Sequence, residues 1–154
     1  MAITVVPTRA DSHTRLLMLA AVGTGLGWLV LILFWSDAPF ALTFDDAWYY
    51  GEIGRNLAAG HGSTFDTINA TNGYHPLWQA VCVLPHLVGL DGTAAMRTQL
   101  AIQLGCWVTA VVLLVRQVRR PSPFLAVVVV LVAGNPFVLR SVGSGLESGL
   151  VVLV

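Results

Sequence analysis

The stretch FDDAWYYGEIGRNLAAGHGSTFDTINATNGYHPLWQ, residues 44–79, is polar and has long apolar runs on both sides. It holds two of the four histidines of the chain. It also holds half of the eight acidic residues, namely Asp45, Asp46, Glu52 and Asp66. Polar side chains between apolar segments of this length are costly to misplace, and they are usually functional. We therefore expect this stretch to decide both the fold and the function.

The first half of the stretch has the pattern of an amphipathic helix over residues 45–59. Its apolar side is made of Ala47, Tyr50, Ile53, Leu57 and Ala58. Another side carries the polar residues Glu52, Arg55 and Asn56. Thr43 and Asp46 match the capping-box pattern, and Gly60 supplies a stop signal. This spacing predicts a helix suited to the surface of a bilayer.

The composition of the chain is that of a membrane protein. Of its 154 residues, 56% are hydrophobic and 10% are charged, and the mean hydropathy is +0.76. Ordinary globular proteins have about 25% charged residues. The formal net charge is zero, which gives no reason to expect a nucleic acid as partner. Cys82 and Cys106 both lie in apolar runs, and we expect them to be buried free thiols.

Residues 16–35 form an uncharged run of about 20 residues, which is enough to cross a hydrocarbon core of about 30 Å. A cleaved signal peptide would have a shorter apolar region of about 7–15 residues, so we expect an uncleaved anchor. Arg9 and Arg15 precede the run and place its start in the cytoplasm. The loop of residues 37–97 is then predicted to lie outside.

The apolar run of residues 77–90 is about 14 residues long, in the range of interfacial or re-entrant segments. The run after it, residues 98–115, is followed by three arginines, Arg116, Arg119 and Arg120. If residues 77–90 crossed the membrane, these arginines would lie outside, against the positive-inside tendency. We therefore expect residues 77–90 to lie in the outer interface and residues 98–115 to return to the cytoplasm.

Residues 124–139 are predicted to lead outward again, with Asn135-Pro136 breaking or ending this helix near the outer surface. A small-residue loop follows, and another apolar run starts at Leu150. Because that run is too short to span, we expect the chain to be part of a longer protein. The predicted fold class is all-α, with several transmembrane helices and with juxtamembrane amphipathic helices in the first outer loop.

The adjacent carboxylates Asp45 and Asp46 are the candidate catalytic residues. Carboxylates in the first turn of a helix are stabilised by the helix dipole and need no other role. Capping requires only one acid, however, and placing two acids beside a membrane costs free energy. One of them could act as general base toward an acceptor hydroxyl, or the pair could help to hold a divalent cation.

Four further polar residues are candidate substrate-binding residues, namely Arg55, His61, His75 and Glu147. His61 stands between two glycines, which indicates either a turn or a flexible loop that contacts phosphate. His75 precedes the predicted interfacial helix, where it is either an interface residue or a ligand-binding residue. Glu147 is either a simple loop charge or a substrate contact.

The ordered set of motifs resembles the N-terminal part of the GT-C superfamily of membrane glycosyltransferases. The resemblance covers residues 40–150 and rests on an acidic pair after the first span, two further motifs and a small-residue loop. In sequence order these are FDDAWYY, RNLAAGHG, TNGYHPLW and GLESG.

The resemblance implies a lipid-linked sugar donor carried on a polyprenyl phosphate or diphosphate. The sugar is transferred at the outer face of the plasma membrane, with an acid of the first outer loop as base. By position Asp45 matches the catalytic acid and Asp46 its acidic neighbour, and His75 lies where many members have a His-Pro pair. The alternative class is a non-catalytic membrane module or a truncated remnant of such an enzyme.

Overall fold

The computed structural model describes residues 9–118 and 122–142, and all regular structure in these ranges is helical. The helices are α1 (Arg9–Phe34), α2 (Ala38–Leu42), α3 (Asp45–Ala58), α4 (Pro76–Leu87), α5 (Gly92–Arg116), α6 (Pro123–Ala133) and α7 (Pro136–Val142). Between α3 and α4, Thr64 and Ala70 form an isolated antiparallel bridge. The predicted all-α fold class is confirmed for the described residues.

Two helices, α1 and α5, have the length and composition to cross a membrane. The apolar part of α1, Ser12–Phe34, has a mean hydropathy of 2.3, and α5 has a mean hydropathy of 1.8 over 25 residues. Only 22% and 33% of their most apolar windows are buried inside the protein. Large side chains such as Leu19 and Leu114 are mostly exposed, unlike those of a core helix in a soluble protein. A membrane association of these helices agrees with this exposure.

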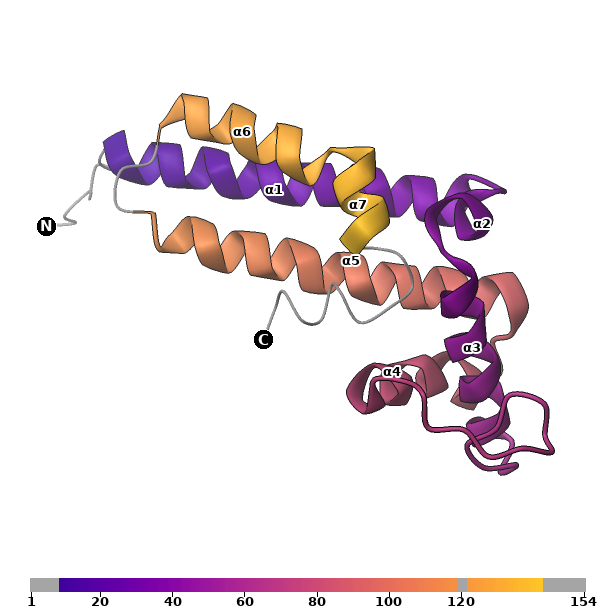
Figure 1. Ribbon diagram of the computed structural model, residues 1–154. Coiled ribbons are helices and arrows are strands. Elements are labelled where there is room, and N and C mark those ends of the chain that lie inside the picture. Colours follow the sequence, from indigo (N-terminus) through magenta and orange to yellow (C-terminus); the bar gives the residue numbers. More distant parts are fainter. Residues whose placement is uncertain (1–8, 119–121, 143–154) are drawn as a thin grey trace, which may run out of the picture.

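The two long helices run antiparallel, and α1 is the centre of a bundle in which it packs against both α5 and α6 (Figure 1). The N-terminal end of α1 and the C-terminal end of α5 lie at the same end of this bundle (Figure 1). Helices α2, α3 and α4 lie at the opposite end. This arrangement agrees with the predicted antiparallel course of residues 16–35 and 98–115.

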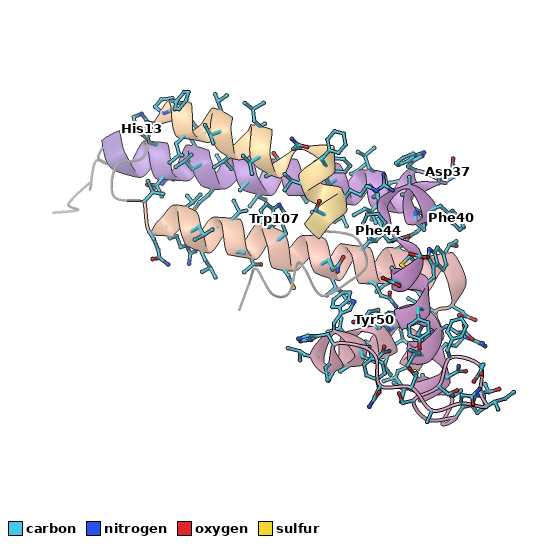
Figure 2. All side chains as sticks on the ribbon, in the orientation of Figure 1. His13, Asp37, Phe40, Phe44, Tyr50 and Trp107 are labelled. Atoms are coloured by element: carbon cyan, nitrogen blue, oxygen red, sulfur yellow. The ribbon has the colours of Figure 1, made fainter. Side chains whose placement is uncertain are left out.

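Two apolar clusters hold the bundle together, one near each end. Leu17 of α1, Val115 of α5 and Ala126 of α6 form the cluster near the start of α1. The other cluster joins α1 and α5 to α2 and the start of α3. Its buried members are Ile32, Ala38, Leu42, Ala47, Met96, Leu100 and Leu104. Figure 2 shows the whole set of side chains, with Trp107 between the long helices.

Helices α3 and α4 form a second unit, which we call the α3–α4 unit and which includes the connection of residues 59–75. Its core contains Tyr50, Trp78 and Cys82, all buried. Gly54 lets the backbones approach closely, because a Cβ at this position would lie 2.7 Å from the carbonyl oxygen of Cys82. The apolar side of α3 therefore packs against α4 and α5. The interfacial position of residues 77–90 stays a prediction.

Two local predictions about α3 are wrong. The N-cap of the helix is Phe44, whose side chain makes no capping hydrogen bond. Thr43 Oγ1 instead accepts a hydrogen bond from Trp48 Nε1 at 3.0 Å and donates to the carbonyl of Pro39, so it is not available for a capping box. Asn56, expected on the polar side, is 1% exposed and holds the following loop.

The predicted span of residues 124–139 consists of two helices, α6 of 11 residues and α7 of 7 residues. The break falls at Gly134, Asn135 and Pro136, where Pro136 cannot donate a helical hydrogen bond. Asn135 Oδ1 accepts the N–H of Phe137 at 2.8 Å and starts the second helix. At about 1.5 Å per residue, α6 alone is too short to cross a bilayer.

Candidate functional site

Three carboxylates line an open pocket of about 450 Å³ on α3, which we call the acidic pocket. Asp45, Asp46 and Glu52 contribute the carboxylates, and Trp48, Tyr49 and Phe65 form the aromatic walls. Residues three, four and seven apart lie on one side of a helix, so α3 alone brings Asp45, Trp48, Tyr49 and Glu52 together. Helix α3, which carries all of the lining residues except Phe65, lies at the end of the bundle where α1 leads into α2 (Figure 1).

The aromatic walls are fixed by stacking and by hydrogen bonds. Tyr49 stacks on Phe65 with ring centroids 4.9 Å apart and an angle of 20° between the rings. Phe40 stacks on Trp48 at 5.1 Å and 15°. The hydroxyl of Tyr49 lies 2.8 Å from Thr71 Oγ1. Such rings offer flat apolar faces next to polar groups, an arrangement that suits an amphipathic ligand.

Phe65 reaches the pocket because Asn56 ties its loop to α3. The Asn56 side-chain amide donates to the carbonyls of Thr64 at 2.9 Å and of Phe65 at 3.1 Å. Farther along the loop, Ser63 Oγ is hydrogen-bonded to the Thr71 carbonyl and lies close to the hydroxyl of Tyr74. The buried Asn56 therefore positions one wall of the pocket although it does not line it.

Asp66 closes the tip of the same loop. Its carboxylate accepts the backbone N–H groups of Ile68 and Asn69 at 2.9 Å and 2.7 Å, and also the side-chain amide of Asn69 at 2.7 Å. The bonds from Asn69, followed by that from Ile68, hold the pKa of Asp66 well below its ordinary value. Asp66 is thus a structural acid of the loop, and it does not line the pocket.

The electrostatics of the acidic pocket are uneven along α3. Asp45 and Asp46 are exposed in the first turn, where Asp45 Oδ1 accepts the N–H of Asp46 at 3.1 Å and the helix dipole favours negative charge. Glu52 forms an ion pair with Arg55, in which Arg55 Nε donates to Oε2 at 3.0 Å. The hydrogen bond and the charge of Glu52 raise the pKa of Arg55. The end of the pocket near Asp45 thus carries more uncompensated negative charge.

The other candidate substrate-binding residues lie apart from this pocket. Arg55 touches it only through Glu52. His61 is exposed in the loop, with Nδ1 3.5 Å from Asn56 Oδ1. His75 is the N-cap of α4, where its backbone N–H donates to the hydroxyl of Tyr50 at 2.7 Å and its side chain is exposed. Glu147 lies outside the described residues.

Sequence reasoning missed Glu52, Trp48, Tyr49 and Phe65 as members of the site. The first three have a sequence signal, because their spacing from Asp45 puts them on the same side of a predicted helix. Phe65 has none, since its position depends on the fold of a loop held by Asn56. Among the described residues, no three His, Cys, Asp or Glu side chains are grouped as a metal site.

The chain matches no protein-family model, no curated protein and no solved structure.

Proposed function

We propose that the chain is part of a membrane glycosyltransferase that moves a sugar from a polyprenyl-phosphate-linked donor to an acceptor hydroxyl. The observation that carries this proposal is the acidic pocket, in which three carboxylates and three aromatic side chains lie on α3 and its following loop, while α3 packs against α5, a helix able to cross a membrane. Carboxylates can bind hydroxyl groups and accept a proton, and aromatic faces can stack on a sugar ring. Nearby lipid would hold the prenyl chain of the donor.

In the proposed reaction, Asp45 accepts the proton of the acceptor hydroxyl while the oxygen forms a bond to the anomeric carbon of the donor. The bond from that carbon to the phosphate oxygen breaks, and the polyprenyl phosphate leaves with the electron pair. Because the leaving group is already good, the protein mainly orients the acceptor and takes up one proton. Asp46 orients the acceptor or binds a divalent cation, and Arg55, His61, His75 and Glu147 are proposed to contact the donor.

We propose a plasma-membrane location in which the described chain passes the membrane several times and the acidic pocket faces outward. The arginines in the first turns of α1 and those at and after the end of α5 support this orientation by the positive-inside tendency. The juxtamembrane position of α3 and α4 follows from their place at the outer end of the bundle in this orientation. The partners are then the lipid-linked donor and membrane lipid.

Replacement of Asp45 by Asn tests the proposal, because it keeps the shape of the side chain and removes the base. Turnover of a polyprenyl-phosphate sugar in detergent should fall by about 10²-fold or more, with donor binding nearly intact. Asp46→Asn should lower turnover by a smaller factor. Asp37→Asn is the matched control because Asp37 is an exposed acid outside the pocket. Turnover with and without a chelator tests for a metal. Wild-type turnover by Asp45→Asn would exclude Asp45 from the mechanism.

The second candidate function is a non-catalytic membrane module. It is favoured by the exposure of Asp45 and Asp46 in a first helical turn, where both are stabilised without any substrate. A module of this kind would show no turnover in the wild-type chain, and Asp45→Asn would change only the stability of α3. Donor binding that persists without turnover would favour this second function.

A further inference from the structure

A second and smaller pocket, of about 60 Å³, lies where α3, α4 and α5 meet, and we call it the amide pocket. Trp48 and Glu52 of α3, His86 of α4, Asp91 before α5, and Met96 and Gln99 of α5 are among its lining residues. Trp48 and Glu52 also line the acidic pocket, so the two pockets are neighbours. None of the functions discussed above uses the amide pocket.

Two buried polar atoms of its lining have no hydrogen-bond partner within the described part of the chain. Gln99 is 0% exposed, and its Nε2 donates to the carbonyl of Cys82 at 3.4 Å while its Oε1 is unpaired. The side chain of His86 is 6% exposed, and its Nε2 is likewise unpaired. Buried polar atoms are nearly always hydrogen-bonded in native proteins, so these two atoms of one pocket can take their partner from a bound ligand.

The two unpaired atoms and the carboxylates of the lining residues can act as hydrogen-bond acceptors. His86 Nδ1 lies 3.7 Å from Asp91 Oδ1, and a proton on Nδ1 facing that carboxylate leaves a lone pair on Nε2. Gln99 Oε1 and the carboxylate oxygens of Glu52 and Asp91 can only accept. Asp91 Oδ1 also accepts the N–H of Gly92 at 2.8 Å, so the start of α5 is already capped.

The charge and the volume of the amide pocket further restrict the kind of ligand that it can bind. Glu52 and Asp91 carry two negative charges, of which Arg55 offsets one through its ion pair with Glu52. The indole of Trp48 lines the pocket and can attract a cation with its ring face. A volume of about 60 Å³ has room for about two groups the size of a water molecule.

We propose that the amide pocket binds a primary ammonium group together with its attached carbon. Three N–H donors on one positively charged nitrogen match Gln99 Oε1, His86 Nε2 and a carboxylate oxygen. The ammonium group belongs either to a small free amine or to a larger ligand that also fills the acidic pocket. This inference does not rest on glycosyl transfer, because it concerns binding alone.

Titration of the full chain in detergent with methylammonium tests the proposal, with the indole N–H signals of the five tryptophans as readout in NMR spectra. The Trp48 signal should shift and saturate, while that of Trp78, buried in the α3–α4 unit, should stay in place. Potassium ions carry the same charge without N–H donors, and tetramethylammonium is too large. Neither should shift the Trp48 signal at the same concentration.

Gln99→Met keeps the length of the side chain and removes its acceptor oxygen. His86→Phe keeps an aromatic ring and removes its acceptor nitrogen. Each should weaken methylammonium binding by about tenfold or more. Gln103→Met is the matched control, because Gln103 is equally buried one turn farther along α5 and does not line the pocket. If Gln99→Met does not fold, as shown by its spectrum, His86→Phe carries the test.

Three results would overturn the proposal: no saturable shift with methylammonium, equal binding of potassium, or unchanged binding in both pocket variants. Glucosamine distinguishes the two sources of the ammonium group. Binding tighter than that of methylammonium supports the ammonium group of a larger ligand that reaches into the acidic pocket. Equal or weaker binding supports a small free amine. An Asp45→Asn variant that loses turnover of the donor but still binds methylammonium separates this inference from the proposed function.

Discussion

The bundle of α1, α5 and α6 and the α3–α4 unit are held together by different interactions. Apolar side chains make most of the contacts of the bundle. Its hydrogen bonds between helices are concentrated at one end, where the Arg97 guanidinium of α5 donates to the carbonyls of Ile32, Trp35 and Ser36. In the α3–α4 unit, hydrogen bonds join separate segments, as when Gln79 Nε2 donates to the Tyr50 carbonyl at 3.1 Å. Apolar packing leaves helices room to adjust, whereas such bonds fix single atoms. The acidic and amide pockets both lie against the α3–α4 unit, whose geometry is fixed by these hydrogen bonds.

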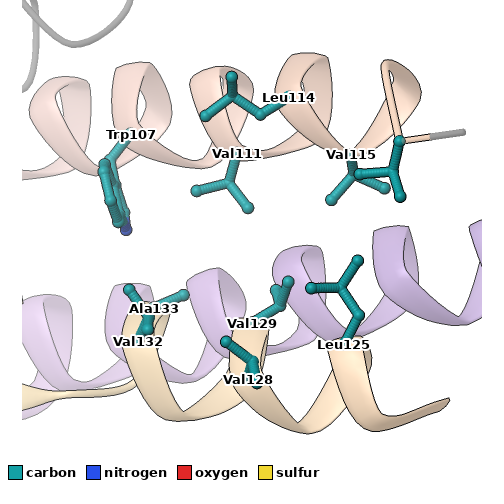
Figure 3. Close-up of a pocket in the computed structure, with 10 residues that line it drawn as sticks. Trp107, Val111, Leu114, Val115, Leu125, Val128, Val129, Val132 and Ala133 are labelled. Atoms are coloured by element: carbon teal, nitrogen blue, oxygen red, sulfur yellow. The ribbon is translucent and has the colours of Figure 1, made fainter. Parts of the chain in front are cut away.

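The apolar groove between α5 and α6 shows the looser packing of the bundle. Trp107, Val111 and Val115 of α5 face Leu125, Val128 and Val129 of α6 across a pocket of about 270 Å³ (Figure 3). Both helices pack on α1 but make few contacts with each other. In water such a groove would be costly, whereas in a bilayer lipid chains can cover apolar surface at little cost.

The largest expected effect is all-or-none and concerns the two ends of the bundle. If the membrane orientation is as proposed, an impermeant maleimide should label Ile68→Cys, in the exposed loop, and leave Gln117→Cys at the end of α5 unlabelled in intact cells. The background is Cys106→Ala, because Cys106 is the partly exposed native thiol. Permeabilised cells should label both positions. Labelling of Gln117→Cys in intact cells would invert the proposed orientation.

The next largest effect is expected at the contact of α3 with α4. Gly54→Ala places a Cβ 2.7 Å from a backbone carbonyl, which cannot rotate away as a side chain can. We expect a loss of about 2 kcal/mol in the free energy of unfolding, and Gly51→Ala should be neutral or stabilising by up to about 1 kcal/mol because its Cβ has ordinary contacts.

Cys82 reports on the same contact. Burial raises the pKa of its thiol to about 12, so the native thiol should react slowly. Gly54→Ala should accelerate its labelling, and Gly51→Ala should not. Equal labelling rates and equal unfolding in detergent for both variants would show that the close backbone approach does not hold the α3–α4 unit together.

The long helices and α3 could be predicted from the sequence, because uncharged length and helical spacing are local properties. Residues 98–115 fall within α5, residues 16–35 extend one residue past the end of α1, and α3 ends one residue before the predicted boundary at 59. The burial of Asn56, the position of Phe65 and the meeting of His86 with Gln99 depend on contacts between distant residues. Nothing in their neighbouring sequence indicates these contacts, so the Phe65 wall of the acidic pocket and the assembly of the amide pocket could not be predicted.

A smaller effect is expected where α1 meets α5. A Cβ at Gly25 would lie 2.5 Å from Val108 Cγ2, which is the end of a side chain that can move. Gly25→Ala should therefore cost about 1 kcal/mol, measured by unfolding in a denaturing detergent. The double variant Gly25→Ala, Val108→Ala should recover part of this loss through a favourable coupling energy. Additive losses would show that the two positions do not touch in the membrane.

The smallest expected effect is a pH dependence of the loop that carries Phe65. The pKa of Asp66 is lower in the folded protein than in the unfolded chain, because the N–H groups of Asn69 and Ile68 stabilise the carboxylate. The folded state therefore binds fewer protons, and the contribution of Asp66 to stability is present above its ordinary pKa of about 3.9. As the pH falls below that value, the contribution is lost progressively.

Hydrogen exchange of the Asn69 amide between about pH 5 and pH 2.5 measures this change, with rates corrected for the intrinsic effect of pH. Protection should decrease toward the acid end in the wild-type chain, and Asp66→Asn should reduce protection at pH 5 and flatten its pH dependence. Because Asp66 is exposed at the loop tip, the effect should be confined to the loop and leave α3 and α4 unchanged. An equal acid response in Asp66→Asn would assign the change to another carboxylate, and Asp45, Asp46 and Glu52 of the acidic pocket would be the next residues to replace.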